Sequence, residues 1–430
     1  MPVFLDTRDA GFAAAFETLL GSKREASQDV SETVAAIIAD VRKRGDAAVL
    51  ALTAKFDRLE LTPETMRFSA EDIAAAYRDV DPKVRAALEL AHARITAHHE
   101  KQKPQDSRYT DAIGVTLGTI WTPVESVGLY VPGGLASYPS SVLMNAIPAR
   151  VAGVERLAMV VPTPDGVVNP AILAAAKIAG VDEIYRIGGA QAVAALAFGT
   201  DTIAPVAKIV GPGNAFVAAA KRQVFGTVGI DMIAGPSEVL VIADSTANPA
   251  WVAADLLAQA EHGGGAQSIV LTTDTALGAA VAEEVERQLA TLRNPEHARE
   301  GWEAFGAIIT AHGRNEVIAL ANRIASEHVE LAVDDPEDLL PAIRNAGAIF
   351  LGHHTPEAIG DYVGGSNHVL PTARSARFAS GLGVLDFVKR TSILGCTPSA
   401  LAELAGAAVT LAETERLQAH GRSVSIRLNG

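Results

Sequence analysis

The sequence contains little cysteine and no long uninterrupted apolar run. Cys396 is the single cysteine among 430 residues, so the chain can form no internal disulfide and no cysteine-rich zinc site. The apolar stretch 142–161 is interrupted by Pro148, Arg150 and Glu155. It therefore falls short of the roughly 18 uninterrupted apolar residues of a membrane span. These absences predict a globular cytoplasmic protein with no membrane partner.

Basic residues are also in the minority. Lysine and arginine number 36 against 50 aspartate and glutamate residues, which gives a formal net charge of −14. Nucleic acids and anionic membranes normally require a basic face, so neither is expected as a partner. The first twenty residues lack the basic segment and cleavage site of a secretion signal. A small soluble substrate is favoured.

Several catalytic signatures are missing. The sequence contains no G-x-S-x-G elbow, H-E-x-x-H helix or Walker A loop, which argues against serine hydrolases, zincins and P-loop enzymes. The dinucleotide fingerprint G-x-G-x-x-G is absent too, because the segment 211–216 ends in Phe216.

Short apolar runs alternate with alanine-rich helical segments from about Trp121 onward, which is typical of parallel βαβ units. One series of expected strands covers 157–161, 183–187 and 208–210, and a second covers 239–243, 268–272, 307–310 and 348–351. The pattern predicts an α/β protein with two parallel sheets. Residues 1–22 suggest an amphipathic arm, Asp29 and Glu32 a capped helix running towards Gly45, and the segment from Gly381 a mostly helical end.

A helix is predicted before the glycines at 263–265, with Asn248 as its cap and Pro249 in its first turn. Its apolar side is expected to comprise Trp251, Ala254, Leu257 and Ala258. Gln259 and His262, three residues apart, would project together from its last turn. Such a pair is usually solvated, and it needs distant partners to become a metal site.

Glu327 and His328 are predicted at a helix-to-strand junction. A carboxylate beside an imidazole suits proton transfer near neutral pH, with histidine as base and glutamate activating water, although adjacent pairs of this kind are common on surfaces. Asp361 offers an oxygen ligand that would complete a mixed nitrogen and oxygen metal shell. Near the end of the chain, Glu415 and His420 on a helical segment would normally face solvent.

Three glycine turns follow expected strands: Gly133-Gly134, Gly188-Gly189 and Gly211-Pro212-Gly213. Glycines at such places let a ligand approach the backbone and bring a helix N-terminus next to phosphate. A bound nucleotide is one interpretation, and tight strand-to-helix connections are the other.

Eight segments resemble the histidinol dehydrogenase family, in family order and over nearly the whole chain. They are GLYVPGG (128–134), GGAQAVAALAFGT (188–200), KIVGPGNAFVAAAKR (208–222), GIDMIAGPSEVLVIAD (229–244), DLLAQAEH (255–262), EHVEL (327–331), GDYVGGSNHVLPTARSARFASGL (360–382) and ERLQAHGRSVSIRL (415–428). The resemblance implies oxidation of L-histidinol to L-histidine through an aldehyde with two NAD+ and one water, the last steps of histidine biosynthesis.

The resemblance also implies roles for individual residues. Glu327 and His328 would be catalytic, with His328 as the base of both oxidations and Glu327 activating water. The residues implied to contact NAD are Tyr130, Gln191 and Asn214. One Zn2+ per subunit would be held by Gln259, His262, Asp361 and His420. The residues implied to contact substrate are Ser237, Gln259, His262, His328, Asp361, His368, Glu415 and His420. Cys396 lies outside these motifs.

The fold implied is two incomplete Rossmann-like domains with small helical terminal segments, in an intertwined homodimer with shared active sites. The expected division is a helical arm at 1–22, a metal-binding and catalytic domain formed by 23–129 with 237–380, an NAD domain at 130–236, and a helical tail at 381–430 that reaches the partner subunit. Two alternatives remain: a related zinc- and NAD-dependent dehydrogenase of another amino alcohol or a diol, and a non-catalytic dimer with structural zinc.

Overall fold

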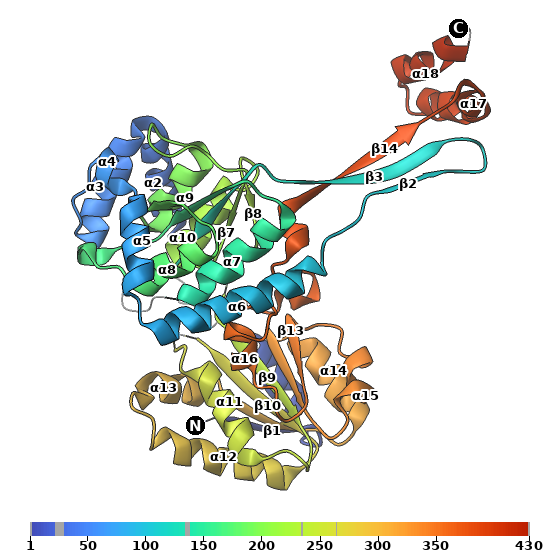
Figure 1. The fold of residues 1–430 in the computed structure, drawn as a ribbon. Coiled ribbons are helices and arrows are strands. Elements are labelled where there is room, and N and C mark those ends of the chain that lie inside the picture. Colours follow the sequence, from blue (N-terminus) through green and yellow to red (C-terminus); the bar gives the residue numbers. More distant parts are fainter. Residues whose placement is uncertain (1, 22–29, 134–137, 234, 264, 429–430) are drawn as a thin grey trace.

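The computed structural model describes residues 2–21, 30–133, 138–233, 235–263 and 265–428. It is an α/β structure with two parallel sheets and a third, antiparallel sheet that projects from the body (Figure 1). This confirms the expected fold class. Over the described residues, no helix combines the length and the apolar character needed to cross a membrane.

The first parallel sheet has five strands. Its spatial order is β6 (Glu183–Tyr185), β5 (Arg156–Val160), β4 (Ser126–Tyr130), β7 (Lys208–Val210) and β8 (Gly229–Ile230). Numbered along the chain, this order is 3-2-1-4-5, the Rossmann order without its sixth strand. The carboxyl ends of β4 and β7 therefore meet where the strand order reverses, which is where such sheets bind ligands.

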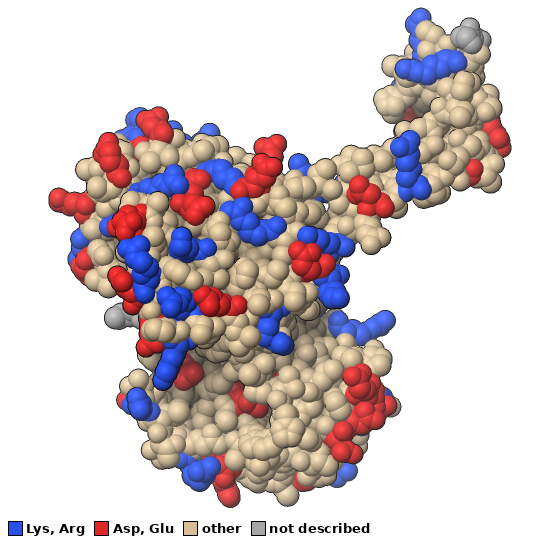
Figure 2. All heavy atoms as spheres, viewed as in Figure 1, with Lys and Arg blue, Asp and Glu red and all other residues tan. Residues whose placement is uncertain are grey.

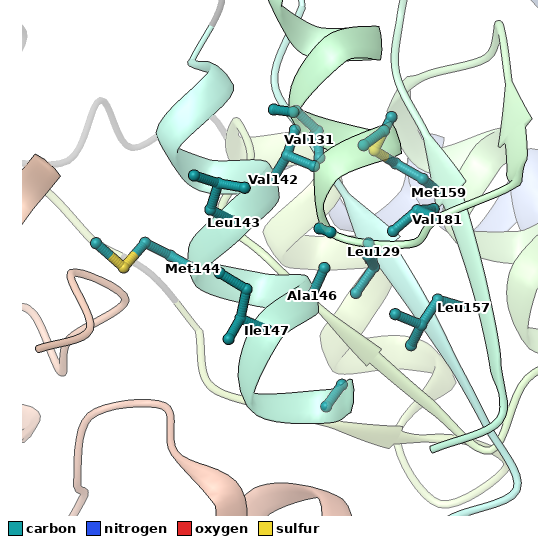
Figure 3. Packing of buried hydrophobic residues seen from close by; sticks show 14 of the residues in the cluster. Leu129, Val131, Val142, Leu143, Met144, Ala146, Ile147, Leu157, Met159 and Val181 are labelled. Carbon is teal, nitrogen blue, oxygen red and sulfur yellow. The ribbon is translucent and has the colours of Figure 1, made fainter. Parts of the chain in front are cut away.

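Helices cover both faces of this sheet, so its strands are nearly continuously apolar. The helices that follow its strands are α7 (Pro139–Ala152), α8 (Pro170–Ile178), α9 (Gly189–Phe198) and α10 (Ala215–Val224), and those that precede them are α2 (Ser31–Arg44), α3 (Asp46–Asp57), α4 (Pro63–Met66), α5 (Ala70–Asp79) and α6 (Pro82–Glu100). Figure 3 shows the packing on one face, where Leu129 of β4 and Met159 of β5 lie close to the side chains of α7.

The second parallel sheet has six strands. Its order is β1 (Val3–Asp6), β11 (Ala307–Thr310), β10 (Gln267–Thr272), β9 (Glu238–Ala243), β12 (His328–Ala332) and β13 (Ala348–Leu351). Without the edge strand β1, the chain order is again 3-2-1-4-5. Its helices are α1 (Phe12–Gly21), α11 (Pro249–Ala260), α12 (Thr275–Leu289), α13 (Pro295–Phe305), α14 (Arg314–Ile324), α15 (Pro336–Leu339) and α16 (Glu357–Tyr362).

A long arm projects from the five-stranded sheet's side of the molecule (Figure 1). It consists of β2 (Ser107–Thr110), β3 (Thr116–Pro123) and β14 (Val388–Gly395), followed by α17 (Pro398–Thr414) and α18 (Gln418–Ser425). All eight residues of β14 pair with β3 in antiparallel register, from Val388 opposite Pro123 to Gly395 opposite Thr116. Uncharged surface dominates this arm in Figure 2.

The two ends of the chain differ in part from expectation. Residues 1–22 do not form a separate arm, because Val3 and Leu5 pair with β11 and Phe16 of α1 is fully buried against the six-stranded sheet. The end after Gly381 is mostly helical, as expected, because α17 and α18 occupy most of it, but it also contains the strand β14, which pairs with β3. The helix predicted from Asp29 begins at Ser31 without a side-chain cap, and Asp29 itself lies outside the described residues.

The packing of residues 30–100 differs from the expected division too. These residues were grouped with 237–380, yet Ile73 of α5 and Ile95 of α6 share a hydrophobic core with β4 and β5. Val34 and Val41 of α2 pack in the other core of that sheet, beside α9. The reason is the amphipathic character of these helices, whose apolar faces cover the five-stranded sheet rather than the six-stranded one.

Candidate active site

A cavity of about 340 Å³ lies where the two parallel sheets face each other. Pro132, Gly211 and Met232 line it from the carboxyl ends of β4, β7 and β8. Ser237 and His328 line it from the amino ends of β9 and β12. The cavity thus lies between the carboxyl ends of the strands in the five-stranded sheet and the amino ends of the strands in the six-stranded sheet.

The peptide of Glu238 holds both members of the Glu-His pair. Its N–H donates to Oε2 of Glu327 at 3.0 Å, and its carbonyl oxygen lies 3.1 Å from Nδ1 of His328. This arrangement follows from the parallel pairing of β12 with β9, which sets His328 beside Val239. Both side chains are nearly buried and line the cavity. The predicted helix-to-strand junction is confirmed.

These contacts fix the tautomer of His328. A carbonyl oxygen can only accept, so Nδ1 carries the proton and Nε2 is left with a free lone pair. Among the described residues, Nε2 has no hydrogen-bond partner, and the nearest carboxylate oxygen is Oδ1 of Asp361 at 3.8 Å. Burial, assisted by His368 and His262, lowers the pKa of His328 to about 3. The ring is neutral and can accept a proton.

Glu357, at the start of α16, was not identified from the sequence. Its Oε2 lies 3.4 Å from Nδ1 of His328, and its side chain is almost fully buried. Burial, followed by the nearby Glu330 and Asp361, raises the pKa of Glu357 well above its ordinary value. Only Pro356 precedes it in sequence as a structural signal, so nothing in the local pattern separates it from an ordinary helix-start acid.

Gln259 and His262 lie as expected at the end of α11, where Asn248 accepts from the N–H of Ala250 and Pro249 occupies the first turn. Gln259 is in the last turn of the helix, His262 lies in the turn that follows Ala260, and both line the cavity. The Nε2 atom of Gln259 is buried without a partner among the described residues.

The predicted apolar side of α11 was wrong in part. Trp251 and Ala254 are exposed, whereas Val252, Ala253, Leu256, Leu257 and Ala260 are buried. The buried side is displaced by about one residue because the helix also covers α12 and α13.

Asp361 and His368 meet on the far side of the cavity. The backbone carbonyl of Asp361 lies 3.0 Å from Nδ1 of His368, so this nitrogen is a donor and Nε2 faces Ser141 Oγ at 3.5 Å. Burial raises the pKa of Asp361 to about 6 and lowers the pKa of His368 to about 4. Ser141 is a second cavity residue that the sequence did not single out.

The three residues implied for NAD differ in their placement. Asn214 lines the cavity and caps α10 by accepting from the N–H groups of Phe216 and Val217. Tyr130 is buried, its hydroxyl accepts from the N–H of Gly189 at 3.0 Å, and burial raises its pKa to about 12. Gln191 is 2% exposed at the start of α9. The last two are not among the cavity-lining side chains.

Glu415 and His420 are not brought to this cavity. Glu415 ends α17 and His420 lies in α18, both exposed at the far end of the arm (Figure 1). The structure therefore unites eight of the twelve predicted residues around the cavity: Asn214, Ser237, Gln259, His262, Glu327, His328, Asp361 and His368.

The donors in the cavity fit a catalytic metal only in part. His262, Asp361 and the amide of Gln259 supply the mixed nitrogen and oxygen donors of a catalytic zinc site. Within the described part of the chain, no group of three or more histidine, cysteine, aspartate and glutamate residues is arranged to hold a metal.

A model of the family described as histidinol dehydrogenase matches residues 21–428. The chain belongs to the histidinol dehydrogenase family. Among its relatives, histidinol dehydrogenase from Agrobacterium fabrum is 66% identical over 429 residues, covering 100% of this chain and 99% of the relative. Histidinol dehydrogenase from Ruegeria pomeroyi is 64% identical over 429 residues, with the same coverage.

Solved structures of histidinol dehydrogenase show the same fold. The crystal structure of the enzyme from Elizabethkingia anophelis is 37% identical, superimposes with a TM-score of 0.95, and covers 100% of this chain and 98% of that chain. The shared fold therefore includes the projecting arm as well as the two parallel sheets.

The raised pKa of Glu357 predicts a pH-dependent stability. The folded chain keeps this proton above the pH at which the unfolded chain releases it, so the glutamate's contribution to the free energy of unfolding falls as pH rises from 4.5 towards the raised value. Glu357→Gln should raise the free energy of unfolding by about 1 kcal/mol or more near pH 8 and change it little near pH 4.

Urea titrations at the two pH values measure the difference. Glu303→Gln, at a glutamate whose side chain is 46% exposed, is the matched control and should show no such dependence. An equal effect of Glu357→Gln at both pH values would contradict a proton retained on this carboxyl group.

Proposed function

We propose that this chain oxidises L-histidinol to L-histidine through L-histidinaldehyde, using two NAD+ and one water, as the last steps of histidine biosynthesis. Membership of the histidinol dehydrogenase family supports the reaction. The observation that carries it is His328, a buried base that lines the cavity beside Glu327 and whose Nε2 has no hydrogen-bond partner among the described residues. An aldehyde formed there is retained between the two sheets.

His328 takes the hydroxyl proton in the first oxidation, at Nε2. The Glu238 carbonyl keeps Nδ1 protonated throughout, so the ring accepts at one atom only and becomes an imidazolium beside Glu357. The carboxylate of Glu327 accepts a proton from water as the water oxygen adds to the aldehyde carbon, and the His328 imidazolium returns its proton to the former carbonyl oxygen. The neutral ring of His328 then acts as base again on the hydrate, and Glu327 releases its proton to solvent. NAD+, when bound, accepts the hydride of each oxidation.

We propose that zinc binds to donor side chains that line the cavity. Gln259, His262 and Asp361 would hold it with His420 from a second subunit, and the ion would act as a template that orients the imidazole and amino nitrogens of the substrate. The unpartnered Nε2 of Gln259 supports this assignment, since a buried amide whose oxygen binds a cation leaves its nitrogen free for the substrate side. Ser237, His368 and the partner's Glu415 would complete the substrate contacts.

A homodimer with shared active sites follows from the arm. Glu415 ends α17 and His420 lies in α18, the two helices at the far end of the arm in Figure 1, and neither residue lines the cavity of its own chain. The arm also exposes Leu394 by 71%, Leu411 by 62% and Ile426 by 59%. Apolar side chains in that number favour burial against another copy of the chain. The localisation proposed remains the cytoplasm.

The stoichiometry of the reaction tests the proposal. Purified protein should form two NADH for each L-histidinol consumed, lose this activity on chelation and regain it with zinc, because two hydride transfers occur at one metal-dependent site. The measurement is NADH absorbance against histidine produced. One NADH per substrate, or turnover of another amino alcohol or diol alone, would favour the related dehydrogenase, and a folded dimer without turnover would favour structural zinc.

Glu327→Gln tests the water-activating role. The oxidation of L-histidinaldehyde should fall by about a hundredfold or more, whereas the oxidation of L-histidinol should fall much less, because only the second step consumes water. Single-turnover kinetics of each half-reaction separate the two. Glu303→Gln is the control, and an equal loss in both half-reactions would remove this role.

Mixed dimers test the shared site. His328→Asn and His420→Asn chains should each be inactive alone, and co-expression should restore about a quarter of the parental activity, since half of the random dimers then hold one intact site of two. Mixing His328→Asn with Glu327→Gln is the matched control, because both changes lie in the same cavity wall and no intact site can form. Failure of the first mixture to recover would place His420 in the site of its own chain.

A further inference from the structure

A buried ion pair lies behind the glycine turn that follows β7. Lys221 of α10 and Asp231 after β8 form a direct contact between Nζ and Oδ1, with side chains exposed by 3% and 1%. Each partner also binds the backbone of Gly211: Lys221 Nζ donates to its carbonyl at 2.9 Å, and its N–H donates to Asp231 Oδ2 at 2.8 Å. Both polar groups of one peptide residue are therefore held by one ion pair.

The backbone at Gly211 has a conformation and a close contact that exclude a side chain at this position. Its φ is +114°, and a Cβ at this position would lie 2.1 Å from the carbonyl oxygen of Tyr130. The turn therefore presses against the end of β4, at the reversal of strand order where Rossmann sheets bind ligands. Asn214, three residues later, caps α10 and faces the cavity.

The two charges of the pair neutralise each other inside the protein and do not face a ligand. Among the described residues that line the cavity, Lys221 is the only lysine or arginine, and its ammonium group is occupied by Asp231 and Gly211. A free lysine would bind a phosphate as a point charge, whereas this one is directed at the protein's own backbone. The pair therefore acts on the cavity through the conformation of the turn at Gly211, which it holds in place.

We propose that Lys221 and Asp231 are positioning residues for NAD, which fix the turn from Gly211 to Asn214 so that its backbone and the start of α10 receive the cofactor. The inference rests on the proposed use of NAD. The geometry explains why a charged pair stands here instead of apolar residues: a donor and an acceptor together satisfy the carbonyl and the N–H of Gly211, and their opposite charges offset each other where both are buried.

Binding of NADH, followed by its fluorescence without substrate, tests the inference. Asp231→Asn should weaken NADH binding about tenfold or more. Lys221 then lacks its counter-charge, and the turn from Gly211 to Asn214 is no longer held in one position. The affinity for L-histidinol, measured by calorimetry on the zinc-loaded protein, should change by less than about threefold, since neither Lys221 nor Asp231 is among the proposed substrate contacts.

Two further variants keep the result decisive. The double variant Lys221→Met with Asp231→Asn leaves no unpaired buried charge, so it should remain folded and still bind NADH weakly, because the carbonyl of Gly211 has lost its donor. Glu183→Gln breaks the pair of Arg156 and Glu183, exposed by 28% and 18% at the opposite edge of the same sheet, and should leave NADH affinity unchanged.

The outcomes separate this inference from the proposed function. If the parent protein binds NADH and the folded double variant binds it equally well, the positioning role is overturned. If both variants lose affinity for NADH and L-histidinol together, or Glu183→Gln weakens NADH binding as much, the pair acts on general stability and the inference also fails. If the parent protein itself binds no NADH, the proposed cofactor is wrong.

Discussion

The backbone of Glu238 fixes the geometry of the Glu327–His328 pair, on which the proposed site depends. One backbone unit in the central strand of a parallel sheet receives the imidazole of His328 on its carbonyl and the carboxylate of Glu327 on its N–H. Backbone atoms of a buried strand move less than side chains, so the two groups keep their separation and the imidazole its tautomer. The depressed pKa of His328 and the raised pKa of Glu357 both follow from the burial that this anchoring requires.

The two sheets share one strand order but contribute opposite edges to the cavity. The five-stranded sheet offers its carboxyl edge, with glycine turns and helix N-termini, and the six-stranded sheet offers its amino edge, where side chains such as Ser237 and His328 begin their strands. The proposed NAD site lies at the first edge, and the acids and bases proposed for proton transfer lie at the second. Because the two edges face each other, the proposed cofactor site and the proposed proton-transfer residues share one cavity.

The sequence predicted the local structure better than the grouping of its parts. The strands near β5, β7, β11 and β13 and the cap of α11 by Asn248 were predictable, because periodicity and capping are properties of neighbouring residues. The position of Glu357 and the pairing of Lys221 with Asp231 were not, since they depend on which helix crosses which strand. The strand β14 was missed because its partner β3 lies far away in the chain and no local pattern records it. The residue types suggested roles for Glu327 and Asp361 that the family resemblance then made specific, and only the geometry shows the two side chains in one cavity.

The edge strand β1 has a consequence for how the chain folds during synthesis. Val3 pairs with Ala307, so the first strand made waits for a partner that is translated about three hundred residues later. The strands of the five-stranded sheet all lie within residues 126–230 and so precede that partner in the chain. Contacts so distant in sequence form slowly, because the loop between them must close first. The strands of the five-stranded sheet are synthesised early, but Val384 and Phe387 of its hydrophobic core are made after Ala307, so the packing of this sheet and the pairing of β1 are both completed late.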